Sequence, residues 1–362
     1  MALTALRLHP YRLPFRHAWR TASGNLDCRE GWLLRLEEDG SNSDETAYGY
    51  GDCAPLPSIG TETPAQALAA LSAWQHQVPG REAGELLESL NQESTFATPA
   101  ARAALECALL DLIARRHRRP LTGCLRGCDC RSSVRVNGSL GALDSLTDAA
   151  LEANLEAGFD VLKLKIGILP TPQEIALLEA LSTRLPAGVM LRLDANRAWD
   201  QSTAAAMVAA LAGLPVESLE EPLTKPNPDL WAALQEKTPF PLALDESLHD
   251  LPPAALFDGT VRRLVLKLPR LGGLIPAVTL AQRFAAAGGD CVVTTALESA
   301  CGVLASAHLA ATLGSDLAHG LATSSWLAAD LGTPPRLDQG RLYLPPGPGL
   351  GFVPTPGLDF SS

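Results

Sequence analysis

A charged residue recurs at the end of five successive apolar segments, and this repeat most constrains how the chain can fold. The positions are Lys165, Asp194, Glu220, Asp245 and Lys267, and successive positions lie 22 to 29 residues apart. That interval holds one strand, one helix and their connections. Strands that alternate with helices are parallel, so the five charges are expected to meet at one edge of the sheet.

The alternation of strand and helix patterns runs from residue 134 to about residue 321. The expected strands are residues 134–137, 161–165, 189–194, 216–220, 242–245, 264–267, 291–295 and 316–321. Ala- and Leu-rich helical patterns lie between them at 145–157, 202–212, 274–287 and 300–313. Eight parallel strands favour a closed barrel. An open doubly wound sheet is the alternative, and no glycine-rich phosphate-binding sequence follows a strand to support it.

A second, smaller domain is expected because 362 residues exceed the roughly 250 of a typical β/α barrel. Strand patterns at 3–8, 31–37 and 47–52, then helical patterns over 64–117, predict an α+β domain across residues 1–130. The barrel is assigned to 131–328, and the Pro- and Gly-rich segment 329–362 is expected to return to the first domain. Segment 17–26 is expected to be a mobile loop that closes over a ligand.

Composition restricts the partners and the compartment. A net charge of −11 argues against nucleic acid or an anionic membrane as the main partner. No apolar run approaches the roughly 20 residues of a membrane span. Eight cysteines without a secretory signal sequence indicate a reducing, cytoplasmic location. Cys124, Cys128 and Cys130 lack CxxC spacing and a nearby fourth ligand, so we interpret them as part of a connector rather than a zinc site.

The strand-end charges predict a divalent cation with a lysine on each side. Three carboxylates cannot share a dry site without a cation, and Mg²⁺, or Mn²⁺ in its place, suits oxygen ligands. A lysine beside a dication has a lowered pKa and can act as a base. This equipment suits proton removal next to the carboxylate of a small substrate. A single strand-end Asp more often caps a turn, so the convergence of five positions carries the prediction.

These residues resemble the enolase superfamily, in its muconate-lactonizing subgroup, over nearly the whole chain. The sequence KLK at 163–165 is similar to the family's KxK motif. Side-chain alternation leaves Glu220 and Glu221 open, and the family pattern selects Glu220. The resemblance implies a modified (β/α)8-type barrel of (β/α)7β form beneath an α+β capping domain. It implies two catalytic lysines and three metal ligands, namely Lys165 and Lys267, and Asp194, Glu220 and Asp245.

Within the superfamily, four stretches are most similar to the o-succinylbenzoate synthase group of menaquinone biosynthesis. They are RTA at 20–22, REGW at 29–32, YGDCAPLP at 50–57 and LRLDANRAW at 191–199. The implied reaction is dehydration of 2-succinyl-6-hydroxy-2,4-cyclohexadiene-1-carboxylate, with Lys165 moving the proton and Lys267 stabilising charge. The backbone N–H groups of a Thr pair are expected to replace those of a Ser pair found in relatives. The implied substrate contacts are Ser23, Lys163, Arg192, Thr294, Thr295 and Glu298.

Two alternatives remain open at this point. The first is another reaction on the same scaffold, racemisation of N-acylamino acids or epimerisation of dipeptides, because both lysines are present. The second is a catalytically inactive barrel kept for binding or assembly, which the intact set of five charged positions disfavours. The sequence leaves the oligomeric state undetermined.

Overall fold

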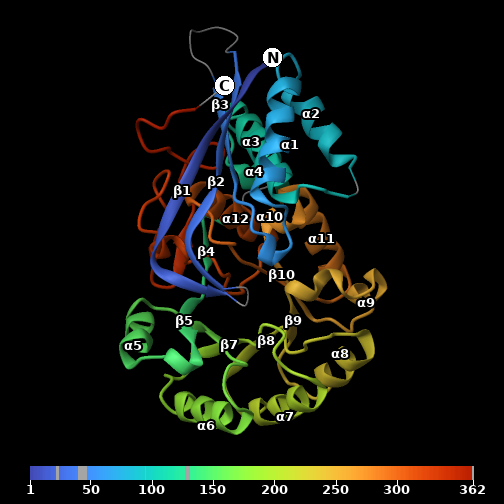
Figure 1. Ribbon diagram of the computed structural model, residues 1–362, viewed down its shortest axis with the longest axis vertical. Coiled ribbons are helices and arrows are strands. Elements are labelled where there is room, and N and C mark those ends of the chain that lie inside the picture. Colours follow the sequence, from blue (N-terminus) through green and yellow to red (C-terminus); the bar gives the residue numbers. More distant parts are fainter. Residues whose placement is uncertain (22–23, 40–46, 94, 127–130, 361–362) are drawn as a thin grey trace.

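The computed structural model describes residues 1–21, 24–39, 47–93, 95–126 and 131–360. A capping layer of antiparallel strands and helices occupies one end of the molecule, and a curled parallel sheet with its helices occupies the other (Figure 1). Both termini lie at the capping end (Figure 1). The predicted fold class, an α/β barrel with an α+β cap, is confirmed. None of the described helices is both long and apolar enough to cross a membrane.

The capping layer begins with an antiparallel sheet in the order β1-β2-β3. Its strands are β1 (Leu3–Thr21), β2 (Gly24–Glu38) and β3 (Ala47–Cys53). The helices α1 (Pro64–Gln77), α2 (Ala83–Asn91) and α3 (Pro99–Arg116) follow, and the short α4 (Leu121–Arg126) ends the layer. Helix α3 lies so close to β3 that a Cβ added at Gly51 would overlap the carbonyl oxygen of Ala104, which explains a glycine within a strand.

The segment 17–26, expected to be a loop, is instead the end of a long β-hairpin. Pairing of β1 with β2 continues through Trp19 with Leu26 to Thr21 with Gly24. The small and polar residues in this segment suggested a loop, but pairing across the hairpin overrides a local preference of that kind. The hairpin runs from the capping end towards the barrel (Figure 1). Residues 22 and 23, which belong to the expected lid, lie outside the described residues.

The barrel is a parallel sheet of seven strands in the order β11-β10-β9-β8-β7-β6-β5. Its strands are β5 (Gly138–Ala142), β6 (Val161–Lys165), β7 (Met190–Asp194), β8 (Val216–Glu220), β9 (Leu242–Leu244), β10 (Arg263–Leu266) and β11 (Asp290–Val293). Its helices are α5 (Asp148–Glu156), α6 (Thr171–Ser182), α7 (Gln201–Leu211), α8 (Pro228–Gln235), α9 (Pro253–Phe257), α10 (Leu268–Leu271), α11 (Leu274–Ala286) and α12 (Ala300–Leu313). Each strand therefore feeds the next through a crossover that packs on the outside of the sheet.

Two of the eight expected barrel strands are wrong. The segment expected at 134–137 overlaps β4 (Ser133–Arg135), which pairs antiparallel with β13 (Arg341–Tyr343) outside the barrel, and β5 takes its place. The segment expected at 316–321 forms isolated bridges only, from His319 to Val136 and from Gly320 to Thr294. These bridges span the two edges of the curled sheet, so the ring closes through single residues rather than an eighth strand.

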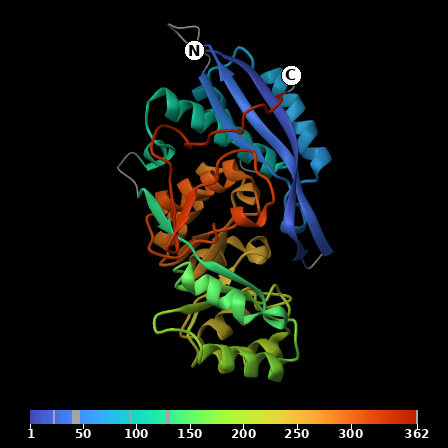
Figure 2. The ribbon, with the colours of Figure 1, turned by 90° about the vertical axis from the view of Figure 1, so that its left-hand side faces the viewer.

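The C-terminal segment packs against the capping layer. After β12 (Arg336–Asp338) and β13, the amide of Leu350 donates to Asp111 on α3 at 2.7 Å. Near the end of the chain, the ring of His9 in β1 contacts the carbonyl oxygen of Asp359 at 2.6 Å. Figure 2 shows this red segment running along the blue sheet. The domain limits at residues 130 and 328 stay predictions.

Candidate active site

The strand register places the charged residues side by side at the carboxyl edge of the sheet. Lys165 is level with Asp194, and Asp194 is level with Glu220. Asp245 and Lys267 directly follow β9 and β10. Active sites of β/α barrels are built at this edge because each strand ends there and its loop can carry function.

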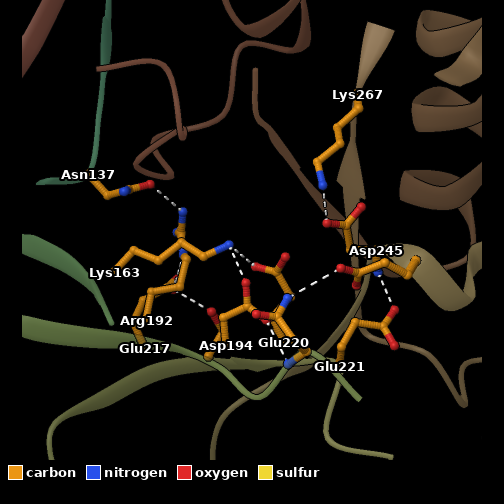
Figure 3. Close-up of polar contacts among 12 residues, drawn as sticks. Asn137, Lys163, Arg192, Asp194, Glu217, Glu220, Glu221, Asp245 and Lys267 are labelled. Atoms are coloured by element: carbon orange, nitrogen blue, oxygen red, sulfur yellow. Dashed lines mark hydrogen bonds and ion pairs between the residues drawn. The ribbon is translucent and has the colours of Figure 1, made fainter. Parts of the chain in front are cut away.

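The carboxylates are buried and each faces a lysine ammonium group. The ammonium group of Lys163 lies 2.8 Å from Oδ2 of Asp194 and 2.7 Å from Oε2 of Glu220 (Figure 3). The ammonium group of Lys267 pairs with Asp245 (Figure 3). Burial, reinforced by the neighbouring carboxylate of Asp194, holds the pKa of Glu220 well above its usual range. Positively charged groups therefore stabilise the buried carboxylates of this site.

The two lysines of the KLK sequence have different surroundings. Lys163 joins two acids, whereas no ion pair connects Lys165 to any residue within the described ranges. Across the site, burial lowers the pKa of Lys267, but Asp245 and Glu246 outweigh burial and raise it. Lys165 is thus the lysine whose ammonium group is not tied to a protein acid.

The carboxylate oxygens at this edge are of the kind that binds a hard divalent cation. Oε1 of Glu220 is buried and has no hydrogen-bond partner in the described part of the chain. Oε2 of Glu246, the neighbour of Asp245, is in the same state. Unsatisfied buried carboxylate oxygens suit Mg²⁺, which binds oxygen. As arranged here, the described residues form no group of three or more His, Cys, Asp or Glu that could hold an ion, because lysines hold the acids on two sides.

Arg192, an expected substrate contact, lies in a buried polar layer and has three protein partners. Its guanidinium group donates to Oδ1 of Asn137 at 3.0 Å and to Glu217 at 3.0 Å (Figure 3). It also donates to the carbonyl of Ala318 at 2.7 Å. Glu217 is an extra residue in β8 at the register shift between β7 and β8, and it also pairs with Arg263. A bulge of this kind re-aims a side chain that regular alternation would send outward.

The backbone N–H groups of Thr294 and Thr295, expected to bind the substrate, already have partners in the protein. The N–H groups of Thr294 and Thr295 already donate to the carbonyls of Leu266 at 2.9 Å and Gly320 at 3.1 Å. They are therefore not free for a ligand, because the first continues the pairing with β10 and the second holds the bridging segment at 319–320. The hydroxyl of Thr294 is buried without a partner in the described structure and remains available. Ser23 lies outside the described residues.

Glu298 lies at the joint between the cap and the barrel rather than beside the acids. Its carboxylate accepts the N–H of Ala296 at 2.7 Å, and burial raises its pKa to about 7. The next residue, Ser299, donates its N–H at 2.9 Å and its hydroxyl at 2.6 Å to Asp52 at the end of β3. A second joint is made by Glu106 of α3, which accepts N–H groups at the start of α11.

Two charged residues that the sequence analysis did not assign lie directly behind Asp245. Glu221 accepts the N–H of Asp245 at 2.7 Å, and Arg270 donates to the carbonyl oxygen of Asp245. Both are buried, with Glu221 at 0% and the Arg270 side chain at 6% exposure. The available signals were an acid repeated next to Glu220 and an arginine three residues after Lys267. Neither signal indicates a partner on a different strand.

Comparison with protein families supports the assignment that the fold and the site suggest. Residues 145–357 match the family described as "Enolase C-terminal domain-like". Residues 3–112 match the family described as "MenC, N-terminal domain". The chain belongs to the enolase superfamily.

Similar proteins catalyse more than one reaction, judged by their names. A hydrophobic dipeptide epimerase of Enterococcus faecalis is 27% identical over 317 residues, covering 86% of this chain and 87% of that protein. An o-succinylbenzoate synthase of Thermosynechococcus vestitus is 33% identical over 248 residues, covering 66% and 67%. The solved muconate lactonizing enzyme of Pseudomonas fluorescens superposes with a TM-score of 0.84 at 24% identity, covering 98% and 97%. The superposition establishes the fold, and the reaction has to be argued from the site.

Proposed function

We propose that this enzyme is an o-succinylbenzoate synthase. It would dehydrate 2-succinyl-6-hydroxy-2,4-cyclohexadiene-1-carboxylate to 2-succinylbenzoate in menaquinone biosynthesis. The observation that carries the proposal is the match of residues 3–112 to the MenC N-terminal domain. These residues form the layer that covers the barrel, and covering elements select the substrate where the barrel supplies shared chemistry. The similarity to the Thermosynechococcus enzyme supports the same choice.

In this proposal Asp194, Glu220 and Asp245 would hold a magnesium ion, with manganese as a possible substitute. The ion would supply positive charge for the substrate carboxylate as that group gains electron density. Lys163 and Lys267 would be displaced from their present carboxylate partners, which leaves two ammonium groups near the substrate. Lys163 and the hydroxyl of Thr294 are the proposed contacts to the polar groups of a small carboxylate substrate. Ser23, Arg192, Thr295 and Glu298 stay untested candidates.

The elimination would use the asymmetry between the lysines. Lys165, which has no acid partner among the described residues, would take the proton next to the carboxylate as a neutral amine. The electron pair of that C–H bond forms the new ring double bond as the C–O bond to the hydroxyl breaks. The Lys165 ammonium then returns its proton to the departing hydroxyl, which leaves as water. Lys267 would stay cationic and stabilise the developing negative charge.

A second reaction, racemisation or epimerisation of an acylated amino acid or dipeptide, has one observation in its favour. Lys165 and Lys267 come from β6 and from the end of β10, on two sides of the carboxylates. Two bases on opposite sides allow a proton to be removed from one face and delivered to the other. The similarity to a dipeptide epimerase supports the same alternative.

The two reactions are separated by one pair of assays. The protein is incubated with Mg²⁺ and the cyclohexadiene substrate, and loss of the diene absorbance is followed. In parallel, N-succinylamino acids and dipeptides are incubated in D₂O, and deuterium uptake with loss of optical rotation is measured. Rapid dehydration with slow racemisation supports the synthase. Racemisation alone would replace the synthase by the epimerase, and inactivity in both assays, with Mg²⁺ bound, would reject both.

A further inference from the structure

The chain carries two adjacent acids at the end of β8, and the backbone sends them in different directions. Glu220 faces the ammonium group of Lys163, as Figure 3 shows. Glu221 has a φ of +47°, a left-handed conformation that is strained for a non-glycine residue. Such a conformation persists only when surrounding contacts require it. The contacts of Glu221 therefore indicate which interactions maintain this conformation.

The backbone N–H of Glu221 donates to the carbonyl of Ala243 and its carbonyl accepts from Arg197, whereas every hydrogen bond of its side chain goes to the turn that begins with Asp245. Oε1 of Glu221 accepts the N–H groups of Asp245 at 2.7 Å and of Ser247 at 2.8 Å, and Oε2 accepts the Ser247 hydroxyl at 2.6 Å. On the other side of the turn, Arg270 donates to the carbonyl oxygens of Asp245 and Glu246, the latter at 2.6 Å. Two charged side chains thus satisfy two N–H and two carbonyl groups of three consecutive residues.

This turn needs such support because Asp245 does not continue the strand. Its φ of −122° and ψ of −88° lie outside both the helix and the strand regions. The backbone conformation decides which way the carboxylate of Asp245 points. Without an acceptor, two buried N–H groups and a hydroxyl would be left unpaired, which destabilises a buried turn.

We propose that Glu221 is a positioning residue that aims the carboxylate of Asp245 at the cation site, with Arg270 holding the opposite side of the turn. The inference rests on the proposed metal-binding function of Asp245 and adds the group that prepares it. Glu221 acts through Asp245 and does not itself bind the ion, because both of its oxygens are occupied by donors from the turn. Partners of this kind typically contribute about 10–100-fold to metal affinity.

Two substitutions separate positioning from simple negative charge. Glu221→Gln removes the charge but keeps the reach, since its oxygen can accept both N–H groups and its amide can donate to the Ser247 hydroxyl. Glu221→Asp keeps the charge but shortens the side chain by one methylene, so it cannot reach all three donors. Positioning predicts a mild effect of Glu221→Gln and a strong effect of Glu221→Asp. A charge effect predicts the reverse.

A matched control is Gln235, which supports the start of β9, the strand that ends just before Asp245. Gln235 is 3% exposed, accepts the N–H of Leu242 at 2.8 Å, and donates to Thr238 at 2.7 Å and to the carbonyl of Phe240 at 3.0 Å. Gln235→Asn shortens a buried side chain by one methylene and loses a comparable set of hydrogen bonds. It should lower stability without changing metal affinity, because it supports the start of β9 and makes no hydrogen bond to the turn that begins with Asp245.

The experiment measures Mn²⁺ binding directly, by the electron paramagnetic resonance signal of free Mn²⁺ during titration of the full-length protein. We expect Glu221→Asp to raise the Kd for Mn²⁺ by about 10–100-fold. Glu221→Gln and Gln235→Asn should stay within about threefold of the parent protein, since neither disturbs the aim of Asp245. Urea unfolding of each variant verifies that the titrated protein is folded.

Three results would overturn the inference. They are an unchanged Kd in Glu221→Asp, a Kd in Glu221→Gln raised as much as in Glu221→Asp, or an equal rise in Gln235→Asn. Asp245→Asn distinguishes a failure of this inference from a failure of the metal site. If Asp245→Asn also binds Mn²⁺ like the parent protein, the proposed cation site itself is wrong. If Asp245→Asn loses Mn²⁺ and Glu221→Asp does not, only the positioning role is wrong.

Discussion

Replacement of Glu217 by Gln should remove a contribution to the free energy of unfolding that depends on pH. The carboxylate of Glu217 lies between the guanidinium groups of Arg192 and Arg263, and its side chain is 15% exposed. Burial raises the pKa of Glu217, but the two arginines more than reverse this and lower it to about 2. The folded protein therefore binds a proton at Glu217 less readily than the unfolded chain does.

The size of the effect follows from the two pKa values. The ordinary value is 4.5 and the value in the fold is about 2. At about 1.4 kcal/mol for each pH unit, the ionised carboxylate contributes on the order of 3 kcal/mol at neutral pH. Because the folded pKa is depressed, this contribution is present above pH 4.5 and is lost as the pH falls towards 2. Two other groups face the layer: Asp290, which pairs with Arg263, and His319, whose pKa is lowered to about 3 by burial and the arginines.

The assay is urea unfolding of the parent protein and Glu217→Gln, followed by tryptophan fluorescence from pH 7 down to pH 3.5. We expect Glu217→Gln to lose about 2–3 kcal/mol of unfolding free energy at pH 7, and the difference to narrow below pH 4.5. The titration of His319 occurs in both proteins and cancels in the difference.

Asp290→Asn is the control for a carboxylate that pairs with the same arginine at a more exposed position. Asp290 is 42% exposed, so solvent screens its pairing with Arg263 and its loss should cost about 1 kcal/mol or less. The reasoning would be refuted by a loss in Glu217→Gln that stays the same from pH 7 to pH 3.5. It would also be refuted if Asp290→Asn destabilised the protein as much as Glu217→Gln does.

Three further predictions address the site and the joint between the layers. Asp194→Asn should leave the fold intact, abolish Mn²⁺ binding and reduce dehydration to background; activity retained in EDTA would contradict this. Lys267→Arg should recover part of the dehydration rate that Lys267→Ala loses, whereas Lys165→Arg should recover none, because guanidinium is not a base near neutral pH. Gly273→Ala should destabilise the protein by about 1–3 kcal/mol in urea unfolding. The reason is that φ is +141° and the new Cβ would overlap the carboxylate of Glu106, the α3 residue that accepts N–H groups at the start of α11. Gly213→Ala, which has open space around it, should be nearly neutral in the same measurement.

Local pattern was sufficient to place most of the barrel and the strand-end charges. The strands at 161–165 and 216–220 were predicted with their observed limits. Both are short apolar runs that end at a charge, so burial and termination are visible within one segment. The spacing of the charges, 22 to 29 residues, then implied parallel strands, and parallel strands place their ends at one edge. The convergence of Lys165, Asp194 and Glu220 follows from those two steps.

The errors fall where pairing between distant segments decided the structure. The segment around residue 134 has the composition of a barrel strand, but Val134 pairs with Leu342 at the other end of the chain. Segment 316–321 contributes single bridges because β11 and the residues before β5 need only one residue between them to close the ring. A pattern within one segment carries no information about which remote segment will compete for its hydrogen bonds.

The sequence by itself determined which residues stand at strand ends, since hydrophobic period and chain spacing are local quantities. Tertiary structure decided what each of those residues faces. The bulge at Glu217 turned an acid towards Arg192, and the left-handed backbone at Glu221 separated it from its neighbour Glu220. Both are changes of backbone direction that alternation along a strand does not encode, because they are stabilised by partners on other strands.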